Sequence, residues 1–225
     1  MEESHRTYLP AAGHDLTLPL YDIFVKLFGF DRAREALVDQ AAIRPGHRVL
    51  DIGCGTGTLA VLIKRLHPEV EVVGLDPDPK ALARARRKAA ANAVSIQFDQ
   101  GFSDELPYPE SSFDRVFSSY MFHHLKSTDK EKTLLEVRRV LKPGGFLYLL
   151  DFGGPENRRE GFLTRLIHSN HLMKDNFDGR IVTLMSRAGL REPKVISHRA
   201  MLFGTIAYYQ ATVHDSASLD RLKIS

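Results

Sequence analysis

An aspartate followed by three closely spaced glycines is the strongest chemical signal in the sequence. The run reads Asp51-Ile52-Gly53-Cys54-Gly55-Thr56-Gly57 and directly follows the apolar residues Val49 and Leu50. Glycine permits the backbone conformations of a tight turn and lets a ligand approach the main chain closely. In doubly wound sheets, a glycine-rich turn between the first strand and its helix is where ligands bind. The run therefore predicts a ligand-binding loop.

Two acidic residues indicate which kind of ligand this loop binds. A dinucleotide fingerprint, G-x-G-x-x-G, needs a third glycine where this chain has Thr58. A carboxylate at Asp51 would repel a pyrophosphate and attract a cationic group. Asp76 ends the next apolar run, 21 residues after Gly55, and is placed to accept hydrogen bonds from two ribose hydroxyls. An adenosine that carries a positive charge fits both carboxylates, whereas a dinucleotide fits only one.

Alternating apolar runs predict the elements that position these residues. The regular alternation of strands and helices predicts a doubly wound α/β fold, with a mostly parallel sheet of seven strands and helices on both faces. An antiparallel strand pair is expected at one edge, and helical spacing from 21 to 42, broken at Gly29, predicts an N-terminal helical cap. The expected strands are 48–52, 71–76, 95–98, 114–118, 146–150, 194–197 and 205–213, and the expected helices are 59–66, 80–91, 134–141 (ended by Lys142-Pro143-Gly144-Gly145), 162–167 and 181–188.

Length and composition limit the remaining possibilities. The 225 residues suffice for one α/β domain with an extension, which we divide into an arm and cap (1–42), a core domain (43–215) and a polar tail (216–225). The 31 Lys and Arg against 28 Asp and Glu leave a net charge of +3, which argues against a nucleic-acid clamp. A single cysteine excludes an intramolecular disulfide and argues against a cysteine-based zinc site. The start of the chain holds no apolar signal core, and no apolar run approaches the ~20 residues that span a bilayer, so we expect a cytoplasmic protein.

Several motifs, in order, resemble those of the class I S-adenosylmethionine-dependent methyltransferases. The similarity covers about 21–151 and is strongest to the branch that holds the ubiquinone/menaquinone-biosynthesis enzymes and many small-molecule methyltransferases. It implies a Rossmann-like fold, S-adenosyl-L-methionine as the cofactor, a core domain that binds it and a small-molecule acceptor. The matching motifs are Val49–Gly57, Val73–Pro77, Gln100–Pro107, Ser112–Val116, His123–Leu125 and Arg139–Gly145.

The resemblance also implies cofactor contacts, most of them at the ends of the expected strands. They involve acidic side chains, backbone groups and one aromatic residue that closes over the cofactor. In chain order they are Tyr21 over the cofactor, Asp51 with the backbone of Gly53, Cys54 and Gly55 at the methionine part, Asp76 at the ribose, Pro77 near the adenine, and backbone groups of Ser118 at the methionine end.

One position departs from the family pattern. Relatives carry Gly-Asp-Ala after the third strand, and the aspartate accepts a hydrogen bond from the adenine amino group. Here the triplet is Gly101-Phe102-Ser103. Phe102 cannot accept that bond, although its backbone N–H and its ring can contact the adenine. Such a bond contributes about 1.5–3 kcal/mol. We therefore expect Phe102 and Ser103 to bind the cofactor less tightly than the Asp-Ala pair of the relatives does.

Methyl transfer from a sulfonium is an in-line displacement that chiefly needs alignment and exclusion of water. A general base is required only if the acceptor is a hydroxyl, a protonated amine or an acidic carbon. Tyr120, His123 and His124, after the fourth strand, are the candidates. For the two histidines a structural role is the favoured interpretation, because the family that the sequence resembles often carries histidines there as part of the fold. Neighbouring side chains diverge and no spaced carboxylates accompany these histidines, so we expect no metal site.

The sequence therefore predicts an enzyme that transfers a methyl group from S-adenosylmethionine to a small-molecule acceptor. Two alternatives remain. The first is a non-catalytic S-adenosylmethionine-binding sensor or partner subunit, for which Phe102 in place of the aspartate is the argument. The second is an NAD-dependent Rossmann oxidoreductase, against which Asp51 and Thr58 both argue.

Overall fold

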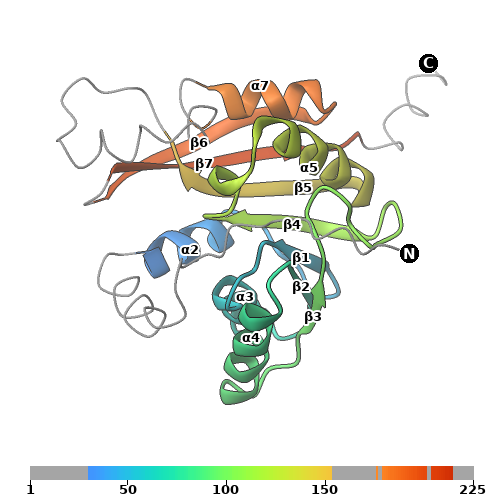
Figure 1. Ribbon diagram of the computed structural model, residues 1–225, viewed down its shortest axis with the longest axis vertical. Helices are drawn as coiled ribbons and strands as arrows, with labels where there is room; N and C mark the ends of the chain where they lie inside the picture. Colours follow the sequence, from blue (N-terminus) through green and yellow to red (C-terminus); the bar gives the residue numbers. More distant parts are fainter. Residues whose placement is uncertain (1–29, 154–175, 177–178, 202–203, 215–225) are drawn as a thin grey trace.

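The computed structural model describes residues 30–153, 176, 179–201 and 204–214 of the chain. These residues are organised around a seven-stranded sheet (Figure 1). The strands are β1 (Arg48–Ile52), β2 (Glu71–Asp76), β3 (Gln97–Gln100), β4 (Phe113–Ser119), β5 (Leu141–Phe152), β6 (Arg191–Met201) and β7 (Gly204–Thr212). They lie in the order β3-β2-β1-β4-β5-β7-β6. Only β7 is antiparallel to its neighbours, β5 and β6. The predicted Rossmann-like fold with an antiparallel edge pair is confirmed.

Helices cover both faces of the sheet, as the doubly wound pattern requires. They are α2 (Phe30–Asp39), α3 (Thr58–Leu66), α4 (Pro79–Ala91), α5 (Ser127–Val140) and α7 (Arg180–Arg187), with a 3-10 turn, η1 (Phe122–His124). Helices α5 and α7 lie on one side of the sheet, and α2, α3 and α4 on the other (Figure 1). None of the described helices has the length and apolar character needed to cross a bilayer.

Each face of the sheet has its own apolar core, because successive side chains of a strand point to opposite sides. On β1, Leu50 and Ile52 pack under α5 and α7, whereas Val49 packs under α2, α3 and α4. All three are fully buried. Strand β1 therefore lies at the centre of both cores, and the residues at its end are fixed by the packing of the whole domain.

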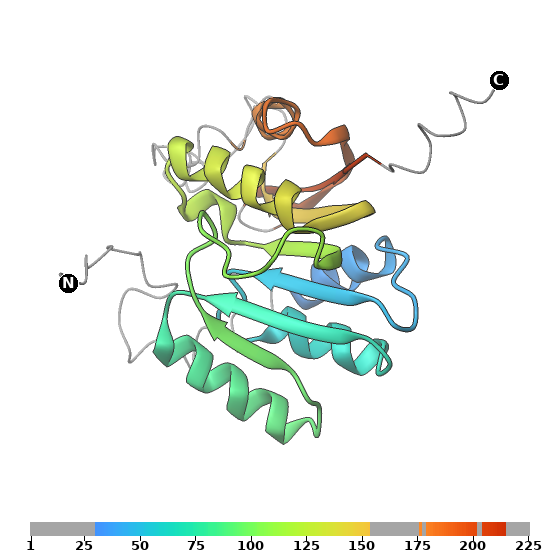
Figure 2. The ribbon, with the colours of Figure 1, turned by 90° about the vertical axis from the view of Figure 1, so that its right-hand side faces the viewer.

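The parallel strands all end at one edge of the sheet. Figure 2 shows β1, β2 and β3 with their arrowheads at the same edge. The chain crosses from β1 to β2 on one side, while β4 pairs with the other side of β1, so the strand order reverses there. Ligands of open α/β sheets bind in the crevice at such a reversal.

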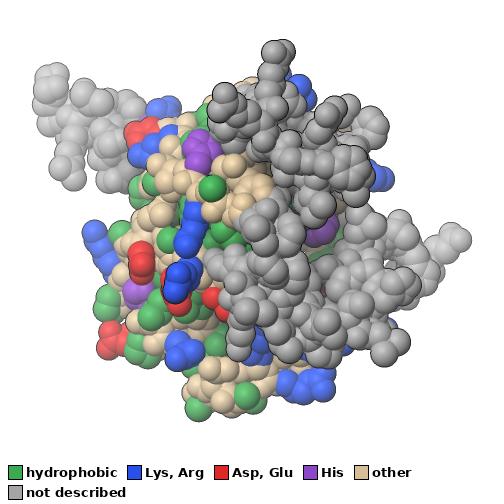
Figure 3. Space-filling view, turned by 90° about the vertical axis from the view of Figure 1, so that its left-hand side faces the viewer, with side chains coloured by type: hydrophobic (Ala, Val, Ile, Leu, Met, Phe, Trp, Pro, Cys, Tyr) green, Lys and Arg blue, Asp and Glu red, His purple; other side chains and the backbone are tan. Residues whose placement is uncertain are grey.

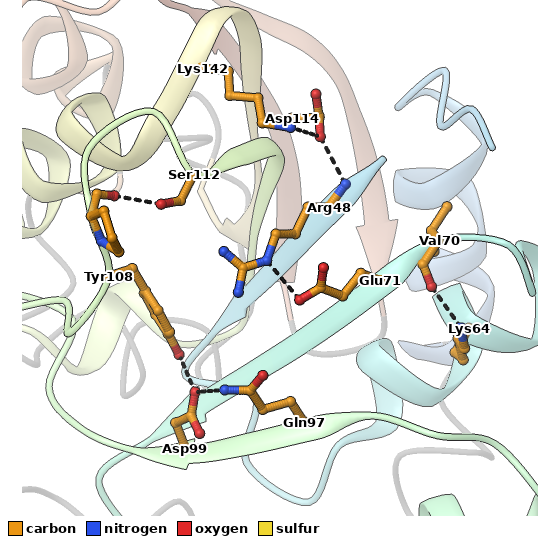
Figure 4. A network of polar contacts seen from close by, with 11 residues as sticks. Arg48, Lys64, Val70, Glu71, Gln97, Asp99, Tyr108, Ser112, Asp114 and Lys142 are labelled. Carbon is orange, nitrogen blue, oxygen red and sulfur yellow. Dashed lines mark hydrogen bonds and ion pairs between the residues drawn. The ribbon is translucent and has the colours of Figure 1, made fainter. Parts of the chain in front are cut away.

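Ion pairs join the strands at the opposite edge, where they begin (Figure 4). The Arg48 Nε lies 2.7 Å from an oxygen of Glu71 on β2. The Lys142 Nζ lies 2.7 Å from a carboxylate oxygen of Asp114 on β4, and the same oxygen accepts the backbone N–H of Arg48. Paired charges thus stabilise the edge of the sheet where the strands begin, opposite to the edge where the parallel strands end.

The structure corrects several predicted boundaries. The sequence Lys142-Pro143-Gly144-Gly145 was expected to end a helix, but α5 ends earlier, at Val140, and these residues belong to β5. The pairing register between β4 and β5 shifts between Phe113 and Arg115, which accommodates the extra residues. Strand β3 also lies two residues later than expected, at 97–100. The expected helix at 162–167 and the first helix of the cap lie outside the described residues.

A buried arginine attaches the end of α2 to the sheet. Arg115 on β4 is 8 % exposed. Its Nε donates to the carbonyl of Ala41 at 2.8 Å, and its Nη2 donates to that of Ala42 at 3.3 Å. The Nη1 donates to the Asp114 carbonyl at 2.7 Å. One guanidinium therefore satisfies carbonyl groups from two segments that lie far apart in the sequence.

Replacement of this arginine by an apolar residue of similar length will destabilise the fold. Arg115→Met leaves buried carbonyls without donors, and we expect a loss of about 2–4 kcal/mol in the free energy of unfolding. Arg138→Met, at an exposed position of α5, serves as the matched control and should change stability by less than about 0.5 kcal/mol. Urea denaturation of both variants measures the difference, and equal stabilities would contradict the role given to Arg115.

Candidate active site

The residues predicted to bind a ligand lie at the edge where the parallel strands end. Asp51 occupies the end of β1, Asp76 ends β2, and Ser118 lies near the end of β4. Pro77 and Phe102 follow β2 and β3 and are partly exposed. Tyr21 lies outside the described residues. The fold therefore gathers at one edge positions that are up to 67 residues apart in the sequence.

The carboxylate of Asp51 is buried without a hydrogen-bond partner in the described structure. The residue is 1 % exposed, and neither oxygen is satisfied. The pKa of Asp51 is raised to about 7, chiefly by burial and also by nearby Asp76, while Arg34 and the Ala60 amide counteract this only in part. An unpaired buried carboxylate is costly. The site thus fits a ligand that brings a positive charge or several hydrogen-bond donors to this point.

The glycine loop turns its N–H groups away from any ligand. The amides of Gly53 and Cys54 both donate to the Leu75 carbonyl, at 2.8 and 3.0 Å. The Gly55 amide donates to Oδ2 of Asp76 at 2.8 Å. A phosphate-binding loop presents such amides to the ligand, so this arrangement argues against a pyrophosphate. Backbone contacts to a ligand at these three positions would come from carbonyl and Cα groups.

Asp76 supports the loop and keeps capacity for a ligand. Its second oxygen, Oδ1, accepts the N–H of Asp78 at 2.9 Å. The side chain is 9 % exposed, and burial is the main reason that its pKa is raised above the ordinary value. A carboxylate accepts about four hydrogen bonds, so two oxygens that hold one backbone N–H each can still accept from ribose hydroxyls. Gly55 adopts the left-handed conformation, with a φ of 53°, that brings its amide to Asp76.

Cys54 and Lys88 have structural roles in this loop. Burial raises the pKa of the Cys54 thiol well above its ordinary value, and the sulfur packs beside Gly74, where a Cβ would lie 2.9 Å away. The thiol is therefore a packing group rather than a nucleophile. Lys88 of α4 donates to the hydroxyls of Thr56 and Thr58, at 2.9 and 2.7 Å. The sequence does not predict this contact, because the arginines and the lysine of α4 have the pattern of a basic, solvent-exposed helix face.

Tyr120 redirects the chain after β4. It has a φ of 55°, which is uncommon for a residue other than glycine. Its ring packs at 5.0 Å from that of Phe30 and 5.7 Å from that of Phe152, and the Arg34 guanidinium lies 5.3 Å from its centroid. The hydroxyl is buried without a hydrogen-bond partner, and burial raises the pKa of Tyr120 strongly. A phenol in this state is a poor general base.

His123 is bound to a carboxylate that the sequence prediction missed. Asp151, near the end of β5, is fully buried and accepts both the backbone N–H of His123 at 2.9 Å and a contact from its Nδ1 at 2.6 Å. His124 stacks beside it with ring centroids 4.0 Å apart. Burial, and then His123, lower the pKa of His124 to about 4. Asp151 ends an apolar strand as Asp51 and Asp76 do, and that same signal could have identified it.

The two serines of the predicted site differ in their surroundings. Ser118 is 3 % exposed, and its hydroxyl has no partner in the described part of the chain. It pairs with Ile52, so its side chain faces the side of the sheet opposite to that of Asp51. The hydroxyl of Ser103 hydrogen-bonds Thr133 of α5 at 2.8 Å and is thereby directed away from the loop. On the face shown in Figure 3, the described surface carries acidic and basic side chains interspersed.

Comparison with known proteins decides the family. A family described as "Methyltransferase domain" matches residues 49–145. A demethylmenaquinone methyltransferase from Thermus thermophilus is 40% identical over 151 residues, which are 66% of this chain and 68% of that protein. The chain belongs to the class I S-adenosylmethionine-dependent methyltransferases. A demethylmenaquinone methyltransferase from Deinococcus radiodurans is also 40% identical, over 66% of this chain, and the match spans 62% of that relative's length.

Solved structures of methyltransferases share the fold. A SAM-dependent methyltransferase from Aquifex aeolicus superposes with a TM-score of 0.63 over 84% of this chain and 92% of that one, at 20% identity. Identity this low supports the fold alone. The position of the glycine loop at the end of β1, next to the unpaired Asp51, is thus part of a methyltransferase fold and not of an unrelated dinucleotide domain.

Removal of the buried charge at Asp51 will stabilise the ligand-free protein. The pKa of about 7 in the folded state lies above the ordinary value of 3.8 for an aspartate, so ionisation of Asp51 opposes folding fully above pH 7 and hardly at all below pH 4. A difference of this size corresponds to about 4 kcal/mol. We expect Asp51→Asn to raise the free energy of unfolding by about 2–4 kcal/mol at pH 8 and by less than half as much at pH 5.

Asp114 supplies a control of opposite sign. Burial alone would raise its pKa, but the Arg48 amide and Lys142 hold it below the ordinary value. Asp114→Asn should therefore lower stability at pH 8. Denaturation curves of both variants at the two pH values measure this contrast. A loss of stability in Asp51→Asn at pH 8 would show that the carboxylate already has a partner in the protein.

Proposed function

We propose that this protein transfers a methyl group from S-adenosyl-L-methionine to a small-molecule acceptor. The observation that carries the proposal is the buried, unpaired carboxylate of Asp51 beside a glycine loop whose amides are engaged elsewhere. This combination suits a cationic adenosyl compound and disfavours a pyrophosphate. Membership in the methyltransferase family supports the same cofactor.

The residues of the edge have distinct tasks in this proposal. Asp51 binds the positively charged methionine part, and Asp76 accepts hydrogen bonds from the ribose. When bound, the cofactor supplies a methyl group that is activated by the positive charge on its sulfur. The rings of Phe30, Tyr120 and Phe152, which pack against one another, help to exclude water and to align the acceptor.

Pro77 and Phe102 complete the adenosine end of the proposed site. Both are partly exposed and follow the ends of β2 and β3. The Pro77 carbonyl accepts from the side-chain amide of Gln100 at 3.2 Å, which keeps the loop after β2 close to the end of β3. Phe102 offers a ring where relatives offer a carboxylate, so adenine binding here depends on apolar contact more than on a charge-assisted bond.

Both alternatives are weaker. An NAD-dependent oxidoreductase would need free amides in the glycine loop and tolerance of a pyrophosphate beside Asp51. A non-catalytic binding protein rests on Phe102 alone. The relatives named demethylmenaquinone methyltransferases support a small-molecule acceptor over a nucleic acid. We also propose a cytoplasmic location, in keeping with a single, buried, unpaired cysteine.

Replacement of the ribose-binding carboxylate will weaken cofactor binding. Asp76→Ala removes the acceptor for the ribose and also the partner of the Gly55 amide, so we expect the dissociation constant for S-adenosylhomocysteine to rise more than tenfold. Calorimetric titration measures it, with NAD as the comparison ligand. Asp114→Ala, at the opposite edge of the sheet, is the matched control and should bind normally. Binding of NAD alone by the wild type, or an unchanged constant in Asp76→Ala, would contradict the proposal.

A further inference from the structure

The contact between His123 and Asp151 fixes the orientation of the imidazole. Asp151 is fully buried, and its two oxygens accept three donors. The His123 backbone N–H binds Oδ2 at 2.9 Å, while the Phe152 N–H and the His123 Nδ1 both lie on Oδ1, at 2.7 and 2.6 Å. The Phe152 ring meets the imidazole in an edge-to-face contact, with the two ring centroids 5.2 Å apart, and restricts it further. The ring is therefore held by its own backbone, a carboxylate and an aromatic neighbour.

This arrangement selects one tautomer of the neutral imidazole. A carboxylate surrounded by N–H donors can only accept, so the proton of neutral His123 must reside on Nδ1. The lone pair is then on Nε2, for which no hydrogen bond is found among the described residues. The side chain is 14 % exposed, so the ring is not sealed in the core. The result is a basic nitrogen with a fixed direction and no competing partner in the described structure.

This nitrogen belongs to the same edge as the glycine loop. Met121, two residues before His123, lies against Gly53, where an added Cβ would come within 2.2 Å of its Cγ. Strand β4, which leads to His123, pairs with β1, which carries Asp51 next to its end, and with β5, which carries Asp151. The turn that holds the imidazole is thus packed directly on the loop proposed to bind the cofactor.

We propose that His123 is the general base of the reaction and that Asp151 is its positioning residue. This inference rests on the proposed function and makes the class of acceptor narrower. The acceptor must give up a proton, so it is a hydroxyl, a protonated amine or an acidic C–H compound and not a thiolate or a tertiary amine. In the step, the acceptor's electron pair forms the bond to the methyl carbon. The methyl–sulfur bond breaks with its pair left on sulfur, and the acceptor's proton goes to Nε2 and then to water.

The neighbouring candidates are less suited to this role. Tyr120 has a buried hydroxyl whose pKa is raised, so it does not ionise readily. His124 has a pKa of about 4, chiefly because of burial, and is a weak base. In the described part of the chain, no hydrogen bond or ion pair joins His124 to a carboxylate. Only His123 combines a carboxylate partner with an open nitrogen.

The tautomer can be measured on the whole protein without knowledge of the acceptor. Long-range ¹H–¹⁵N spectra at pH 8 should show His123 protonated on Nδ1 and unprotonated on Nε2. Asp151→Asn should lose this preference, because the added amide group can donate to Nδ1. His124→Asn, the matched control, should leave the His123 signals in the same tautomer. Protonation of His123 on Nε2 in the wild type would overturn the assignment.

Turnover tests the chemical role. His123→Asn keeps a donor for Asp151 and removes the base. With a panel of phenols as acceptors, its kcat for formation of S-adenosylhomocysteine should fall about 10²–10⁴-fold. With the matching thiophenols, which ionise without help, kcat should change less than about threefold, and His124→Asn should resemble the wild type on both panels. Equal losses on phenols and thiophenols, or no loss on phenols, would show a structural role only.

A binding control separates the two proposals. His123→Asn should bind S-adenosylhomocysteine as the wild type does, since it lies outside the groups proposed to hold the cofactor. Failure of the wild type to bind this compound would refute the proposed function itself. Normal binding with the wrong tautomer, or with no selective loss on phenols, would refute only the role of His123 and Asp151. If Asp151→Asn fails to fold, the loss of kcat on phenols in His123→Asn decides whether His123 is the base.

Discussion

The buried charge of Asp51 is the constraint on which the rest of the site depends. Two apolar cores hold β1 between them, and they place this carboxylate where water cannot reach it. Its pKa of about 7 reflects the free-energy cost of burying this charge. At neutral pH the carboxyl group is therefore protonated in a large fraction of the folded molecules. A stable fold tolerates such a group when binding a ligand repays the cost. The surrounding residues are best understood as supports for that binding.

Three acids at the ends of strands illustrate how partners decide function. Among the described residues Asp51 has no hydrogen-bond partner, Asp76 accepts the amides of Gly55 and Asp78, and Asp151 contacts an imidazole. All three are buried and end apolar runs. In the proposed function their tasks nevertheless differ, since Asp51 binds a cation, Asp76 accepts hydrogen bonds from hydroxyls and Asp151 orients a base. The end of a buried strand is thus a position that the fold can use for different tasks without a change in its architecture.

The sequence predicted what depends on local pattern and missed what depends on contacts between distant residues. Strands β1 and β2 have the predicted bounds because each is a compact apolar run with an acid at its end or next to it. The glycines of 142–145 were misassigned, since a register shift against β4 decides that they continue a strand. Asp151 and His123 are 28 residues apart, and Lys88 is 32 residues from Thr56. Neither pairing has a local signal. It takes the strand order to bring β4 beside β5, and the helix packing to bring α4 over the loop.

The left-handed backbone at Tyr120 connects these parts. Such a conformation costs about 1–2 kcal/mol for a residue with a side chain. Here its amide still bonds the Leu150 carbonyl at 2.8 Å, so β4 keeps its pairing with β5 up to the turn. The chain then changes direction, and Met121 covers Gly53 while His123 reaches Asp151. An extended residue at 120 would carry the chain onward along the sheet edge and separate the imidazole from the carboxylate. The strain is offset by the packing of the Tyr120 ring on Phe30 and Phe152, which also encloses the site. The aromatic contacts that we propose to exclude water therefore also hold the backbone turn that leads to His123.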